Sequence, residues 1–279
     1  MISKILAGGV VIAGLVGASA GAASAATTHP AAAPKVAVGS VELGQPLQYE
    51  RFIALQGCGR NHGDVWYTNW AQPDTVNSGV FAPAPAAAGQ PLTFTTSGGT
   101  SYGHTLNTAS LSETAKSVDR LAFTGTGEYG TNPTVDPWTI SGQVKDDSVQ
   151  FTITYGSWAG PAYSVTGTGS IAADGSAQGT AKDSAGQALT WHMPAGAFMS
   201  VLSYHARIQS AQIQPRWHGG NATFGFTIPK AGGSLAGTRV TVKVHDGGRG
   251  YAHDTYAHGV TGNPVTKYQI IGGPGITIP

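Results

Sequence analysis

The sequence predicts an all-β protein: an antiparallel up-and-down meander or barrel followed by an immunoglobulin-like β-sandwich unit. Three observations lead to this prediction. Only 10% of the 279 residues are charged and 41 are Gly, whereas long helices and coiled coils need Glu, Lys, Leu and Arg in bulk. Apolar residues alternate with Thr and Gln over long stretches, as in strands with one buried face. Short turns rich in Asp and Gly separate these stretches.

Composition also excludes two classes of protein. Hydrophobic residues make up 41% of the chain and the formal net charge is +1, so the chain has apolar surface to bury and does not have the charge of a disordered protein. A nucleic-acid-binding domain usually carries a surplus of Lys and Arg, and this chain has none. We therefore expect no nucleic-acid partner.

The first 25 residues have the pattern of a secretory signal peptide. Lys4 forms a positive start, residues 5–17 form an apolar run, and Ala23 and Ala25 fit the small-residue pattern before a cleavage site. The apolar run is shorter than the roughly 20 residues that span a membrane. We predict a secreted, extracellular protein with no membrane attachment after cleavage.

The next stretch, residues 26–89, is predicted to hold a leader, N-terminal strands and a linker. Ala and Pro dominate residues 26–35 and again 82–89, as in extended linkers. Between them, residues 36–55 alternate loosely, as one or two strands do. The single helix that the sequence predicts lies later, over 111–118, because Ser110 and Glu113 have the spacing of a capping box.

Residues 90–196 are predicted to form the meander or barrel. Alternation is strongest from Leu121 onward, where successive half-buried strands are joined by tight turns such as the one at Asp174-Gly175. Gly residues occupy several inward positions, including Gly127 and Gly169, which indicates strong curvature.

Residues 199–279 differ in texture and predict the sandwich-like unit. Two alternating strands, 222–228 and 240–244, flank a Gly-rich loop, a pattern typical of half an immunoglobulin-like sandwich. In residues 138–155 and 226–259, the chain resembles Gly- and Thr-rich secreted β proteins of high-GC Gram-positive bacteria. The resemblance implies no defined activity and no functional residue.

One candidate ligand site is the aromatic stretch around Trp66. Aromatic faces can stack on a sugar ring while neighbouring polar groups bind its hydroxyls. The alternative is that the same rings belong to the core. The candidate ligand-binding residues are Trp66, Tyr67, Trp70, Arg60 and Asp64.

A second candidate site is the densest cluster of ionisable groups, near the C-terminus. If the protein is an enzyme, we expect a secreted hydrolase in which one imidazole is a general base or a Zn ligand and a carboxylate is its partner. The residues concerned are His245, His253, Asp254 and His258. Their spacing fits no standard metal signature, and Asp before Gly also forms turns, so surface His and structural turns are the alternative.

The single cysteine, Cys58, excludes an internal disulfide. Cys58 could be a nucleophile with His62 as its base, but a thiol without a catalytic role is the simpler interpretation. We predict a non-catalytic protein, without cofactor or metal, that binds a neutral small molecule or glycan. A secreted hydrolase and a structural cell-surface protein are the alternatives, and the oligomeric state stays open.

Overall fold

The computed structural model describes residues 33–44, 48–57, 59, 62–75, 79–84, 89–129, 136–248 and 250–279. The predicted signal peptide, Cys58 and Arg60 lie outside these residues. The described chain is almost entirely antiparallel β-strand, so the all-β prediction is confirmed. None of its helical segments has the length and apolar character needed to cross a membrane.

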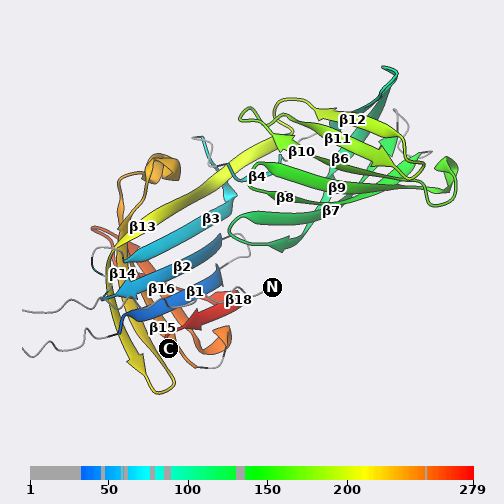
Figure 1. Cartoon of the computed structure of the whole chain (residues 1–279). Coiled ribbons are helices and arrows are strands. Elements are labelled where there is room, and N and C mark those ends of the chain that lie inside the picture. The colour runs from blue at the N-terminus through cyan, green and yellow to red at the C-terminus, as the bar shows by residue number, and fades with distance from the viewer. Residues whose placement is uncertain are drawn as a thin grey trace, which may run out of the picture. The chain divides into compact units, whose positions relative to one another are not determined.

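Eight consecutive strands form a closed antiparallel barrel, which confirms the predicted meander (Figure 1). Each strand pairs with the next along the chain, and the last pairs with the first: Trp191 of β12 lies opposite Phe94 of β5. A 3₁₀ segment, η1 (Ser157–Ala159), follows the fifth strand. The barrel strands are β5 (Gln90–Thr96), β6 (Ser101–Lys116), β7 (Arg120–Tyr129), β8 (Pro137–Lys145), β9 (Ser148–Tyr155), β10 (Ser164–Ile171), β11 (Ala177–Asp183) and β12 (Ala188–Met193).

Aromatic side chains fill the barrel, and inward glycines leave room for them. Trp138 and Trp191 are each 2% exposed. A Cβ atom on Gly127 would lie 2.0 Å from the ring of Trp138, and one on Gly169 would lie 2.5 Å from the ring of Trp191. Glycine is therefore required at both positions by the close approach of an indole, in addition to the curvature that the sequence indicates.

The helix predicted over 111–118 is wrong. Residues 111–116 form the end of β6, in which Ser112 lies opposite Thr124 and Glu113 opposite Phe123 of β7. A capping-box spacing satisfies only two backbone donors, whereas pairing with a neighbouring strand satisfies donors and acceptors along the whole segment. An irregularity in the pairing between Asn107 and Ser112 marks where β6 departs from regular alternation.

A second sheet combines the N-terminal and C-terminal strands, with the barrel inserted between them in the sequence. Its strand order is β17-β16-β15-β14-β13-β3-β2-β1-β18, and β4 pairs with the start of β13. Figure 1 shows β3 beside β13, although about 130 residues separate them in the chain. The strands are β1 (Lys35–Leu43), β2 (Gln48–Gln56), β3 (Gly63–Pro73), β4 (Phe81–Pro83), β13 (Phe198–Arg216), β14 (Gly219–Thr227), β15 (Arg239–Asp246), β16 (Thr255–Val260), β17 (Thr266–Tyr268) and β18 (Ile270–Thr277). The 3₁₀ segments η2 (Lys230–Leu235) and η3 (Tyr251–His253) lie in its loops.

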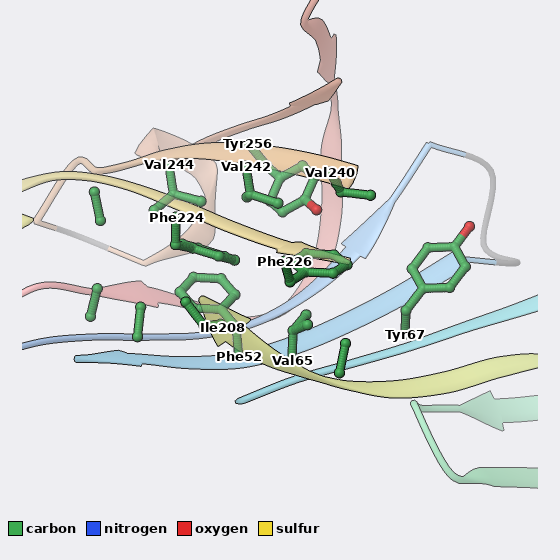
Figure 2. Close-up of a cluster of buried hydrophobic side chains, with 14 of the residues drawn as sticks. Phe52, Val65, Tyr67, Ile208, Phe224, Phe226, Val240, Val242, Val244 and Tyr256 are labelled. Carbon is green, nitrogen blue, oxygen red and sulfur yellow. The ribbon is translucent and has the colours of Figure 1, made fainter. Parts of the chain in front are cut away.

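The large sheet curls around its own hydrophobic core. Figure 2 shows side chains of β14, β15 and β16 directed toward those of β2 and β3. The rings of Phe52 and Phe224 meet at 4.8 Å between centroids, and Val242 and Val65 are fully buried on the two sides. The strands predicted for 199–279 thus share one sheet and one core with the N-terminal strands.

Two buried aspartates bind the edge of β18 to the β15–β16 connection. Asp254 accepts hydrogen bonds from the backbone N–H of Gly247 (2.9 Å) and of Ile276 (2.6 Å). Asp246 accepts one from Gly248 (2.7 Å) and one from Ile278 (2.7 Å). The carboxylates therefore satisfy edge amides that would otherwise be buried without partners.

The same core contains a buried carboxyl group, Glu50, which is 1% exposed. The hydroxyl of Tyr256 donates a hydrogen bond to its Oε2, and its Oε1 has no protein partner. Burial raises the pKa of Glu50 from 4.5 to about 8, because a charge is poorly solvated there. Glu50 is consequently protonated in the folded protein at neutral pH.

Because the folded protein holds this proton between pH 4.5 and 8 while the unfolded chain releases it, stability should fall as pH rises through this window. We expect Glu50→Gln to remove that dependence. The free energy of unfolding of the wild type relative to E50Q should drop by on the order of 4 kcal/mol between pH 5 and 8. Urea denaturation of both proteins at several pH values measures it. Parallel pH profiles would contradict the buried protonated carboxyl.

Candidate functional site

A cavity of about 270 Å³ opens at one end of the barrel. This end carries the β5–β6, β7–β8, β9–β10 and β11–β12 connections, since the barrel is an up-and-down meander. We call the cavity the mouth pocket. Its lining residues are Phe94, Tyr102, His104, Tyr129, Tyr155, Trp158, Tyr163, Val165, Gln187 and Leu189.

Strand alternation places the inner lining residues. Inward positions recur every second residue, so Phe94, Val165 and Leu189 point into the barrel while their neighbours face outward. These three side chains are buried, at 2%, 2% and 7% exposure. They give the pocket an apolar inner wall.

His104 lies in this pocket among aromatic rings, and it is 5% exposed. Its Nε2 is 2.8 Å from the hydroxyl of Tyr155, and its Nδ1 is 3.4 Å from the carbonyl of Tyr102. If Nδ1–H donates to that carbonyl, Nε2 accepts from the Tyr155 hydroxyl. Burial lowers the pKa of His104 from 6.5 to about 4, so the imidazole is neutral at physiological pH.

Five aromatic side chains form a continuous rim around the pocket. The indole of Trp158 lies 5.7 Å from the ring of Tyr129 and 5.7 Å from the ring of Tyr155. Tyr155 in turn contacts Tyr163 at 5.2 Å, and Tyr129 lies 6.5 Å from Tyr102. Trp158 is 40% exposed and its Nε1 donates to the carbonyl of Pro137, which fixes the ring in place. The rim is therefore preformed.

One side of the rim is held by a buried carboxylate. The hydroxyl of Tyr163 donates to Asp183 Oδ2 at 2.9 Å, and the backbone N–H of Gln187 donates to Asp183 Oδ1 at 2.7 Å. Burial raises the pKa of Tyr163 to about 12, with smaller contributions from Asp183, so its hydroxyl keeps its proton. Asp183 acts as a structural acceptor behind the rim.

The predicted aromatic site at Trp66 is divided between the two faces of β3. Tyr67 is buried in the large sheet's core and stacks on Tyr204 at 5.0 Å. Trp70 is also buried, and its Nε1 donates to the carbonyl of Ser117 at 2.9 Å. These two rings are core residues.

The other described members of that site lie on the outer face of the sheet. Trp66 stacks on His205, with centroids 4.9 Å apart and planes 7° apart, and the guanidinium of Arg51 lies 4.6 Å above the indole. Asp64 Oδ1 is 2.9 Å from His205 Nε2. Arg60 lies outside the described residues. Trp66 and Asp64 thus share a partly exposed surface. Trp70 lies on the same face of β3 but is buried in a separate cluster with Leu121 and Val201, and Tyr67 lies on the opposite face.

The C-terminal His and Asp residues are likewise not brought together. His245 faces outward on β15, where its Nδ1 is 3.0 Å from Asn221 Oδ1. His258 lies on the inner side of β16, its ring 4.4 Å from that of Tyr268, and burial lowers its pKa. His253 is exposed in η3, and Asp254 uses both oxygens for backbone amides.

Among the residues with described positions, no group of three or more His, Cys, Asp or Glu side chains is placed to hold a metal ion. No protein-family model matches the chain, and no curated protein matches it either. Among solved structures, the chain is similar to a redesigned beta barrel, with 19% sequence identity and a TM-score of 0.28. That match covers 38% of this chain and 87% of the other, and a similarity this weak supports no inference about function.

The sequence analysis did not single out His104, Tyr102 or Tyr129 as site residues. A usable signal was present: in an up-and-down barrel, alternate turns lie at the same end. Aromatic residues that flank alternate turns, such as Tyr129 and Tyr155, must therefore surround one opening.

Replacing Asp254 tests whether its carboxylate is structural. In Asp254→Asn, one of the two backbone N–H groups would face an amide NH₂, so we expect a loss of about 1–3 kcal/mol in the free energy of unfolding. Asp174→Asn is the matched control, since Asp174 accepts from Ser176 in an exposed turn through one oxygen that Asn retains. Urea denaturation compares the two. Full stability of D254N would contradict the structural role.

Proposed function

We propose that the protein is a secreted, non-catalytic β protein that binds a neutral small molecule or a glycan in the mouth pocket. The observation that carries the proposal is the preformed aromatic rim around a cavity with an apolar inner wall. Concave, mostly apolar sites with a few placed polar groups are typical of small-molecule binding. The secretory pattern of residues 1–25 supports an extracellular location.

The charges of the pocket support a neutral ligand. No Asp, Glu, Lys or Arg occurs among the described lining residues. Burial keeps His104 uncharged, so the imidazole adds no positive charge at neutral pH. A charged ligand would therefore lose hydration on entry without an ion pair to replace it.

The protonation states of the pocket support a non-catalytic role. General acid–base catalysis works best when the group's pKa lies near the operating pH. The pKa of His104 is about 4, and burial raises the pKa of both Tyr155 and Tyr163. These three groups neither gain nor lose a proton near neutral pH, which suits a binding site of constant polarity.

Removing the exposed indole of the rim should weaken binding. Isothermal titration with 2-naphthol and with methyl β-D-glucoside, one aromatic and one sugar probe, tests the pocket. We expect Trp158→Ala to weaken the binding of whichever probe binds by about tenfold, as loss of an aromatic contact together with its buried area predicts.

Trp217→Ala is the matched control, because Trp217 is 92% exposed in the β13–β14 turn and does not line the pocket. It should bind either probe as the wild type does. Absence of saturable binding for both probes, or equal effects of the two substitutions, would contradict the proposal.

Binding should depend on pH in one direction only. Protonation of His104, with a pKa of about 4, puts a charge in the pocket and removes the acceptor for the Tyr155 hydroxyl. We expect constant affinity for an uncharged probe between pH 6 and 8 and a decline as pH falls toward 4. Titration at each pH, with circular dichroism to confirm folding, measures this. A change in affinity between pH 6 and 8 would assign binding to another titrating group.

A further inference from the structure

The mouth pocket discriminates between the two ligand classes of the proposed function, on which this inference rests. Several of its polar atoms already bind one another, the backbone or Asp183. Both ring nitrogens of His104 have partners, in Tyr155 and the carbonyl of Tyr102. The hydroxyl hydrogen of Tyr163 is donated to Asp183, and the indole N–H of Trp158 to Pro137.

Apart from His104 and Tyr155, whose polar atoms are already paired, the described inner wall is apolar. Phe94, Val165 and Leu189 line it, and all three are buried. A sugar ring carries hydroxyl groups around its whole circumference. Those that faced this wall would lose their hydrogen bonds to water without gaining a partner, which is unfavourable. An aromatic ring carries no such penalty and gains contact with the same wall.

The size and charge of the pocket limit the class of ligand further. A cavity of about 150 Å³ holds one benzene ring, and drug-sized ligands occupy roughly 300–1,000 Å³. The mouth pocket, at about 270 Å³, lies between the two. A cation would find aromatic faces in the pocket. No carboxylate occurs among the described lining residues to pair with it, and Asp183, behind the rim, already accepts hydrogen bonds through both oxygens.

We propose that the mouth pocket binds a neutral aromatic molecule of one or two fused rings, of the phenol or indole class. The ring lies against Phe94 and Leu189, and edge-to-face contacts with the rim orient it. Its single polar substituent lies at the opening, beside the exposed side chains of Tyr102 and Gln187.

Isothermal titration with four probes of graded chemistry tests this class. The probes are 2-naphthol, its saturated analogue decahydro-2-naphthol, methyl β-D-glucoside and tetramethylammonium. We expect 2-naphthol to bind at least about tenfold more tightly than decahydro-2-naphthol, since two or more aromatic contacts are lost in the saturated ring. The glucoside and the ammonium ion should show no saturable binding.

A pair of isosteric substitutions tests the apolar wall. Val165→Thr places a hydroxyl on the inner wall and should weaken 2-naphthol binding severalfold. Val149→Thr buries a hydroxyl in the same barrel core, away from the pocket, and should leave binding unchanged. Thermal unfolding of both variants separates a loss of fold from a loss of binding.

The outcomes separate this inference from the proposed function. Tighter binding of the glucoside or of tetramethylammonium, reduced in Trp158→Ala, would overturn the aromatic class and keep the pocket as a binding site. Equal affinities for 2-naphthol and its saturated analogue would also overturn it. No binding of any probe to the folded wild-type protein would overturn the inference and the proposed function together.

Discussion

Closure of the barrel by pairing between β12 and β5 is the constraint on which the candidate site depends. Leu189 to His192 lie opposite Thr96 to Thr93, so the first and last strands of the meander satisfy each other's backbone groups. Phe94 and Leu189 belong to these two strands, and both form the inner wall of the mouth pocket. Without the pairing, two sheet edges would be exposed and the pocket would have no wall on that side.

The large sheet solves the same edge problem by a different route. Its path ends at β18 and β17, which do not pair with each other in the described structure. Asp246 and Asp254 instead supply side-chain acceptors to the amides of Ile278 and Ile276. From the sequence, Asp254 is a candidate catalytic partner, and an Asp before Gly is expected to form a turn. The structure shows a third use. The carboxylates bind backbone amides near the end of β18, which is neither of the two strands that the turn connects.

Sequence reasoning was sufficient for the consecutive strands of the meander because their signals are local, but it left open whether β12 pairs with β5 to close a barrel. Alternation identifies each strand, and short turns between neighbours leave little choice of partner. The helix predicted over 111–118 does not form, because this segment pairs with Leu121 to Thr124 of β7 instead. A capping pattern is local and carries no information about such a pairing partner. Pairing of β3 with β13 was not predictable, since no local feature of either strand specifies a partner so distant in sequence. The mouth pocket was missed for the related reason that its residues come from six strands and two loops.

Burial, more than composition, keeps the ionisable groups inside the two hydrophobic cores uncharged. Glu50 in the large sheet and His104 in the barrel are both ionisable, yet burial shifts their pKa values in opposite directions so that each is neutral at pH 7. In the barrel, this neutrality extends to the candidate site, because His104 both belongs to the core and lines the pocket. The rings that surround His104, those of Phe94, Tyr129 and Tyr155, exclude water from it and also form the surface offered to a ligand. The packing that stabilises the barrel at this end therefore also keeps His104 uncharged where it lines the pocket.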